Sequence, residues 1–212
     1  MEVAILFRGP LRPSAGAVAN RIEKFLQSIS PMGLSVSTFL ATWKSDQGQD
    51  LTELLNAVKI DNLLAFKSLS DEEIVELSQV KTLKGGVAAQ NVFRQYYLSK
   101  LALDVIAANP RYKYVIHTRT DIDLDLGRYL ETWFEPDLYC TVHLHHFIND
   151  QFAIAPTRIM QAAWNYGSLS ELTRLMEQAA IPEDILQLMI DNAGIKPVRR
   201  ELLYITLDPN RK

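Results

Sequence analysis

The 212-residue sequence has a single cysteine and no long apolar run. One cysteine, Cys140, excludes an internal disulfide framework and suits a reducing compartment, and its neighbours predict a buried strand residue. No stretch approaches the roughly 20 apolar residues of a membrane-spanning helix. The apolar start, 1–7, is interrupted by Arg8-Gly9-Pro10, which argues against a signal peptide. We therefore expect a soluble, cytoplasmic protein without a membrane span, in the host cytoplasm if the sequence is viral.

An excess of positive charge is missing as well. The 22 Lys and Arg residues are outnumbered by 25 Asp and Glu residues, which gives a formal net charge of −3. This balance provides no electrostatic footprint for nucleic acid. Neither G-x-G-x-x-G nor G-x-x-x-x-G-K-[ST] occurs, which disfavours a Rossmann dinucleotide site and a P-loop. Any recognition of phosphate must therefore come from a local cluster of residues.

Apolar runs separated by turn residues predict an alternation of strands and helices. We expect strands at 2–7, 34–40, 62–68, 112–118, 138–144, 151–155 and 198–207. We expect helices from Ser14 to the Pro31-Met32-Gly33 break, and at 51–58, 87–108, 126–134, 157–166, 169–180 and 182–194. This order predicts an α/β fold with a mostly parallel central sheet flanked by helices. Residues 1–212 are expected to form a single domain, and the tail at 209–212 is consistent with a cut from a longer chain that has further domains.

The segment Tyr112–Asp125 is the centre of the functional hypothesis. An aromatic and β-branched strand leads there into three carboxylates at alternate positions. In extended backbone Asp121 and Asp123 project to the same side, where they repel each other unless a cation lies between them. Hard oxygen ligands suit Mg²⁺ or Mn²⁺, which are often shared with substrate phosphates. The segment therefore predicts a metal site for a phosphorylated ligand, and a solvated acidic turn is the alternative.

Three further groups are candidates for the same cleft. The loop after the first strand contains Arg8, Gly9 and Arg12, which would meet a nucleotide or its diphosphate, or would form a plain connection. On helix 87–108, a polar line (Asn91, Gln95, Ser99) would border the cleft or face solvent, and the buried stripe is expected to be Leu98, Leu101, Ala102, Val105 and Ile106. Asp150 is expected at the edge of a strand, close to the metal candidates.

Taken together, these motifs resemble those of small GT-A fold glycosyltransferases, in particular bacterial and viral polysaccharide or lipopolysaccharide transferases. The motifs are Ile5-Leu6-Phe7-Arg8-Gly9, Asn91-Val92-Phe93-Arg94-Gln95, Arg119-Thr120-Asp121-Ile122-Asp123 and Asn149-Asp150-Gln151-Phe152-Ala153. The resemblance covers the chain to about Ala155 and is loose in the last quarter.

The resemblance implies a nucleotide-sugar donor, with UDP favoured, and a glycan or other hydroxyl acceptor. It implies that Asp121 and Asp123 hold Mn²⁺ or Mg²⁺ on the donor diphosphate, and that Asp150 is the catalytic residue near the acceptor or the anomeric carbon. The residues implied in donor binding are Phe7, Arg8, Gly9, Arg12, Asn91, Arg94, Gln95, Arg119 and Asp121. Many GT-A enzymes add a histidine ligand near the C-terminus, but no histidine follows His146 here. Either His145 or His146 would replace it, or water and phosphate would complete the shell.

Two other functions use the same residues. A nucleotidyltransferase of related fold also needs a cation and a nucleotide, but its first loop is usually rich in glycine and contains lysine, unlike 8–14. A non-catalytic, cation-dependent module that binds sugar nucleotides would share every candidate residue and would differ only in lacking turnover.

Overall fold

The computed structural model describes residues 1–9, 11, 14–44, 48–78, 82–125, 134–137, 139–144, 147–200 and 204–207. The strands are β1 (Glu2–Arg8), β2 (Ser35–Trp43), β3 (Asn62–Phe66), β4 (Tyr114–Arg119), β5 (Ile122–Asp125), β6 (Tyr139–Leu144), β7 (Phe147–Pro156), β8 (Pro197–Arg200) and β9 (Tyr204–Leu207). The helices are α1 (Ala15–Ile29), α2 (Gln49–Ala57), α3 (Asp71–Ser78), α4 (Ala89–Ala107), α5 (Thr157–Ala163), α6 (Leu169–Gln178) and α7 (Pro182–Asn192), with a short 3₁₀ turn, η1 (Ser30–Met32). In this part of the chain, no helix is long and apolar enough to cross a membrane.

The main sheet has seven strands in the order β3-β2-β1-β4-β7-β6-β8, and β5 pairs with β9 in a separate two-stranded sheet. Only β7 of the seven runs against the others, which confirms the predicted mostly parallel α/β sheet. The chain moves outward from β1 to β2 and β3, and then returns through α4 to β4 on the other side of β1. The strand order therefore reverses between β1 and β4, and ligands of such sheets bind at the carboxyl ends of the strands beside this reversal.

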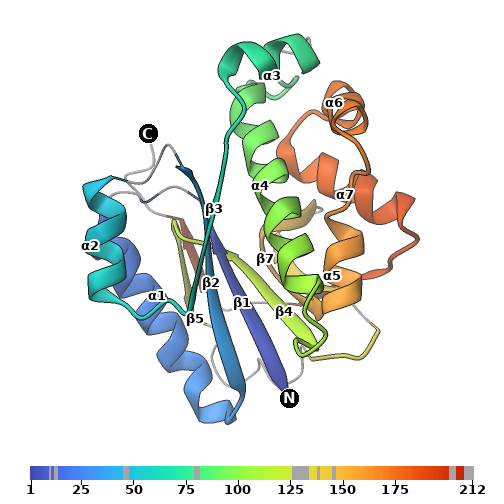
Figure 1. Ribbon diagram of the computed structural model, residues 1–212. Coiled ribbons are helices and arrows are strands. Elements are labelled where there is room, and N and C mark those ends of the chain that lie inside the picture. The colour runs from blue at the N-terminus through green and yellow to red at the C-terminus, as the bar shows by residue number, and fades with distance from the viewer. Residues whose placement is uncertain are drawn as a thin grey trace.

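Helices cover both faces of the main sheet, as Figure 1 shows. On β1, Val3, Ile5 and Phe7 pack with α1 and α2, whereas Ala4 and Leu6 pack on the face covered by α4, α5 and α7. Successive side chains of a strand point to opposite faces, so a strand between two helical layers must be apolar throughout. The continuous apolar sequence of β1 follows from this position.

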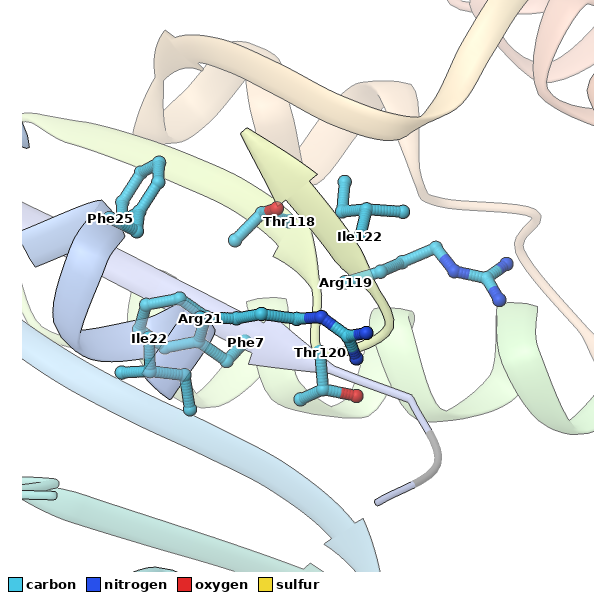
Figure 2. Close-up of a pocket in the computed structure, with 8 residues that line it drawn as sticks. All are labelled: Phe7, Arg21, Ile22, Phe25, Thr118, Arg119, Thr120 and Ile122. Atoms are coloured by element: carbon cyan, nitrogen blue, oxygen red, sulfur yellow. The ribbon is translucent and has the colours of Figure 1, made fainter. Parts of the chain in front are cut away.

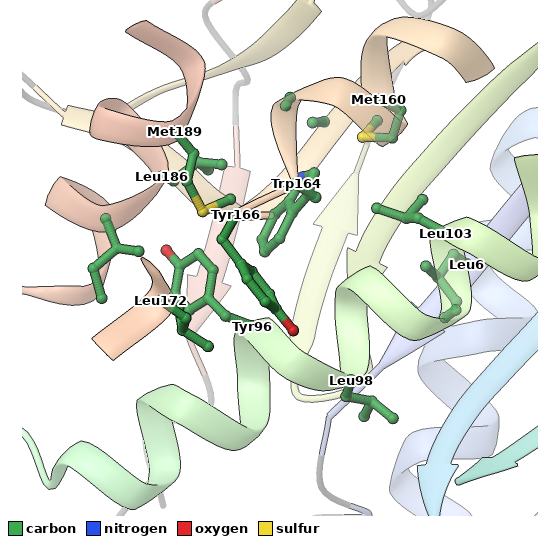
Figure 3. Packing of buried hydrophobic residues seen from close by; sticks show 14 of the residues in the cluster. Leu6, Tyr96, Leu98, Leu103, Met160, Trp164, Tyr166, Leu172, Leu186 and Met189 are labelled. Atoms are coloured by element: carbon green, nitrogen blue, oxygen red, sulfur yellow. The ribbon is translucent and has the colours of Figure 1, made fainter. Parts of the chain in front are cut away.

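Helix α4 confirms the long helix predicted before the acidic segment, but the predicted buried stripe is partly wrong. Val105 is 45% exposed, and the core face of α4 includes Phe93 and Tyr96 instead. Figure 3 shows Tyr96 in a cluster with Trp164, Tyr166 and Leu186, and the rings of Tyr96 and Trp164 lie 5.3 Å apart. The helix contacts the sheet and the helices α3, α5, α6 and α7, so its buried arc is wider than the stripe inferred from one face.

Three predicted strand limits are corrected. Thr120 and Asp121 form a turn between β4 and β5, so Asp121 and Asp123 do not lie on one continuous strand. The turn is fixed by the Thr120 N–H, which donates to the Arg8 carbonyl at 2.9 Å. The expected last strand is divided into β8 and β9, which belong to different sheets. Asp150 lies inside β7 rather than at a strand edge, because β7 begins at Phe147.

Candidate active site

The carboxyl ends of β1 and β4 lie side by side at the reversal of strand order. Arg8 pairs in register with Arg119, the last residue of β4. Gly9 follows with a φ of +119°, which side chains other than glycine rarely adopt, and a Cβ atom there would lie 3.1 Å from Thr120 Oγ1. Glycine at this position therefore permits the close approach of the two chain segments.

Strand β7 places Asp150 at the same edge. Phe152 pairs with Thr118 in the antiparallel ladder, so residues just before Phe152 lie beside the end of β4. The structure thus brings together three motifs that are far apart in sequence: Arg8-Gly9, Arg119–Asp121 and Asp150. The three motifs therefore lie at one edge of the sheet.

Arg8 is enclosed, with only 2% of its surface exposed. Its Nη2 donates to the backbone carbonyl of Asp150 at 2.5 Å and lies 3.9 Å from Asp150 Oδ2. Its guanidinium carbon lies 5.1 Å from the centre of the Trp164 ring. Burial lowers the pKa of Arg8 to about 10, against the opposing effect of Asp150. Arg8 is therefore charged at neutral pH and engaged inside the protein; its proposed contact with a diphosphate stays a prediction.

His117 is a member of this cluster that the sequence analysis did not identify. The Arg8 Nε donates to His117 Nε2 at 2.9 Å, so the neutral imidazole has its proton on Nδ1, which is buried and has no hydrogen-bond partner among the described residues. Burial, followed by the charges of Arg8 and Arg119, holds the pKa of His117 well below its ordinary value. The sequence did contain a sign of this role, because His117 is an imidazole within a strand segment that is otherwise mainly apolar.

A chain of polar contacts joins the two predicted acidic sites. Arg119 and Asp121 form a buried ion pair with two hydrogen bonds. The Arg119 Nη1 also donates to Gln95 Oε1 at 3.3 Å, and the Gln95 amide nitrogen donates to Asp150 Oδ2. Gln95, from the polar line of α4, therefore connects the Arg119–Asp121 pair with Asp150.

Another predicted donor residue, Arg94, is directed away from this network. Arg94 forms an ion pair with Asp71 at 2.6 Å and donates to the Leu69 carbonyl at 3.3 Å, which directs it toward α3. Asn91 is exposed, and Phe7 is buried with its ring against Phe25 of α1. Arg12, His145 and His146 lie outside the described residues, as do the side chain of Asp123 and residues 126–133 of the predicted helix 126–134. Their roles stay predictions.

Glu183, in the first turn of α7, is a second residue that the sequence analysis did not assign to the site. Burial raises its pKa, and the negative charge of Asp150 raises it further, while Arg119 opposes the shift. The signal in the sequence was the acidic helix start Pro182-Glu183-Asp184, which was interpreted only as a helix signal. Asp121, Asp150 and Glu183 thus surround Arg119 with negative charge.

A small pocket adjoins the cluster on the α1 side of the sheet (Figure 2). Its lining comes from β1, α1, the end of β4 and the start of β5: Phe7, Arg21, Ile22, Phe25, Thr118, Arg119, Thr120 and Ile122. The empty volume is about 240 Å³, including space open to solvent. Figure 2 shows Arg21 extending from α1 toward Thr120 at this edge of the sheet. The pocket thus has an apolar base with cationic and hydroxyl groups beside it.

The described residues do not by themselves supply a divalent-cation site. Within the parts of the chain that the structure describes, no group of three His, Cys, Asp or Glu residues could hold a metal ion. Both carboxylate oxygens of Asp121 accept hydrogen bonds from Arg119. The predicted metal site therefore depends on Asp123 and remains a prediction.

Comparisons with known proteins identify the fold. No protein-family model matches the chain, and no curated protein matches it in sequence. The catalytic domain of Drosophila beta1,4-galactosyltransferase 7, in complex with xylobiose, matches with a TM-score of 0.55 and 13% identity over 99% of this chain and 71% of that chain. A mutant form of the Drosophila enzyme, in complex with manganese, UDP-Gal and xylobiose, matches with a TM-score of 0.52 and 11% identity over the same shares of the two chains. A glycosyltransferase involved in glycosylation of the major capsid of PBCV-1 has a TM-score of 0.47 and 12% identity over 95% of this chain and 83% of that chain. The chain has the GT-A glycosyltransferase fold.

Proposed function

We propose that the protein is a metal-dependent glycosyltransferase. It moves a sugar from a nucleoside-diphosphate donor, with UDP favoured, to a hydroxyl group of a glycan or another acceptor. The supporting observation is that Arg8-Gly9, Arg119–Asp121 and Asp150 converge at the reversal point of a GT-A sheet. A role in polysaccharide biosynthesis, with a hexose or deoxyhexose as the transferred sugar, fits this chemistry.

The roles follow from the charge that develops during transfer. Departure of the nucleoside diphosphate builds negative charge on its terminal phosphate, and fixed positive groups stabilise that charge. A bound Mn²⁺ or Mg²⁺, held by Asp121 and Asp123, would supply positive charge there. Gly9 permits the close approach of the loop after β1 to Thr120 at this edge, and Arg119 adds a guanidinium there.

Asp150 is the proposed catalytic residue. In an inverting reaction it would accept the proton of the acceptor hydroxyl, which requires hydrogen-bond contact with that group. In a retaining reaction it would position the transferred sugar. Its place beside the end of β4, in a network with two arginines, supports either role.

Binding and turnover test the proposal directly. UDP-, GDP- and CMP-sugars are compared by thermal shift with and without Mn²⁺, and donor hydrolysis is then measured with the nucleotide that binds. UDP-Gal with Mn²⁺ is the first choice, because both are present in the complex of the Drosophila enzyme. We expect stabilisation by one nucleotide sugar that requires the metal and is lost in Asp123→Ala. Stabilisation that persists without metal, or in that variant, would reject the proposed metal role of Asp121 and Asp123.

A further inference from the structure

The orientation of the Gln95 side chain is fixed by its two neighbours. A guanidinium has no hydrogen-bond acceptor, so the Gln95 atom that contacts Arg119 Nη1 at 3.3 Å must be the carbonyl oxygen. The amide nitrogen is then left to donate to Asp150 Oδ2, as observed. Gln95 thus has a separate group for each partner, and neither contact can form if the amide is reversed.

The backbone of Gln95 is held independently of these contacts. The neighbouring Tyr96 is buried, stacks on Trp164 and donates its hydroxyl to the Pro182 carbonyl at 2.5 Å, which ties α4 to the start of α7. The Ser99 hydroxyl donates to the backbone carbonyl of Gln95 at 2.8 Å. Removing the Gln95 amide therefore leaves the helix in place and frees only the side chains that the amide joins.

Asp150 Oδ2 is contacted from two sides. Gln95 donates to it from α4, and the Arg8 guanidinium lies 3.9 Å away on the β1 side. Within the described part of the chain, Oδ1 accepts no hydrogen bond, and it is therefore the oxygen left for a substrate. The orientation of the carboxyl group depends on the two contacts at Oδ2.

We propose that Gln95 is a positioning residue that fixes the Asp150 carboxylate relative to the Arg119–Asp121 pair, rather than a residue that contacts the donor. This inference rests on the proposed transferase function, in which Asp150 acts at the acceptor side and Asp121 at the donor side. Fixing these carboxylates relative to each other sets the distance and angle at which the acceptor hydroxyl attacks the donor sugar. Small misplacements of reacting groups lower the rate by large factors.

The chain offers a matched control for Gln95. Gln161 of α5 is also half-buried, and its amide nitrogen donates to Asp104 Oδ1 of α4 at 2.9 Å, outside the charged cluster. Gln95→Met and Gln161→Met each remove one amide–carboxylate bridge and keep a side chain of similar size. A purely structural role predicts the same behaviour for both variants.

The test measures kcat and donor KM for transfer, together with the folded fraction by circular dichroism. For Gln95→Met we expect kcat to fall about 10- to 100-fold with donor KM unchanged, and for Gln161→Met we expect both constants unchanged. Equal kinetics for the two variants would overturn the positioning role, and so would a raised donor KM at unchanged kcat, which would assign Gln95 to the donor. Absence of nucleotide-sugar binding in the wild-type protein is a different result, because it refutes the transferase function itself.

A second variant isolates the contact with Asp150. Gln95→Glu keeps the size of the side chain and an acceptor for Arg119, but at neutral pH it cannot donate to Asp150. The charged groups around this position are Arg119, Asp121, Asp150, Arg8 and Glu183. We expect a low kcat at neutral pH that recovers relative to wild type as the pH falls, because the protonated carboxyl group can donate again. A variant-to-wild-type ratio that does not change with pH would contradict the proposal.

Discussion

Arg119 and Asp121 form a two-point ion pair: Nε donates to Oδ1 at 2.7 Å, and Nη2 donates to Oδ2 at 2.6 Å. The exposed fractions are 8% for Arg119 and 7% for Asp121. Removing one partner of a buried pair leaves the other charge uncompensated, which is far more costly than loss of a surface pair. The pair is therefore a structural feature of the edge at which the donor is proposed to bind.

Replacement of Arg119 tests the structural weight of this pair. We expect Arg119→Leu to lower the free energy of unfolding by about 3–5 kcal/mol, because the variant loses a buried ion pair and its two hydrogen bonds. Chemical denaturation measures the change. Arg174→Leu removes the partner of Glu171 in a more exposed pair on α6, and it should change stability little. Similar losses of unfolding free energy in the two variants would show that the buried Arg119–Asp121 pair stabilises the fold no more than the exposed pair does.

His117 predicts a specific pH dependence of stability. Its pKa is lowered in the folded state, whereas the unfolded chain takes up a proton near pH 6.5. The stability contribution of His117 is therefore complete above pH 6.5 and is lost below it, at up to about 1.4 kcal/mol per pH unit. Urea unfolding of wild type and His117→Gln at pH 5.5 and 7.5 measures this slope. Histidines elsewhere contribute equally to both proteins, so identical slopes would refute the assignment to His117.

Glu183 should destabilise the folded state at neutral pH. Because its pKa is raised by burial and by Asp150, its favourable contribution is present below the unfolded value and is lost as the pH rises through the folded value. Glu183→Gln should therefore raise Tm at pH 7.5 more than at pH 4.5. Glu76→Gln, at an exposed position of α3, is the control and should give no such difference. A rise in Tm of Glu183→Gln that is larger at pH 4.5 than at pH 7.5 would contradict the prediction.

Gly9 predicts a backbone effect at the proposed donor loop. Gly9→Ala places a Cβ atom at φ +119° and 3.1 Å from Thr120 Oγ1, so we expect a loss of about 1–3 kcal/mol in stability and weaker binding of the nucleotide sugar. Gly16→Ala is the matched control: it lies in α1 with nothing within 4 Å of the added Cβ, and it should stabilise the protein by about 0.5–1 kcal/mol. Wild-type stability and affinity in Gly9→Ala would show that the loop tolerates a side chain.

Local patterns predicted most of the elements. Ser14 caps α1 by accepting from the Ala17 N–H at 3.3 Å, Gly194 follows α7 with a φ of +66°, and β1 is buried on both faces, all as the sequence indicates. The buried stripe of α4 and the division between β4 and β5 were not predictable. They depend on which neighbours cover the helix and on the Thr120–Arg8 backbone bond, which joins segments 112 residues apart.

The amino-acid sequence by itself determined the order of strands and helices, and it determined that polar motifs follow β1 and β4, since periodicity and turn chemistry are local properties of the chain. Only the tertiary structure decided which charges meet. Arg8 faces Asp150 and His117, Arg94 turns toward Asp71, and Gln95 joins Arg119 to Asp150. The physical reason is that a long polar side chain can reach many groups, and the packing of helices on both faces of the sheet decides which of them lie within hydrogen-bonding distance.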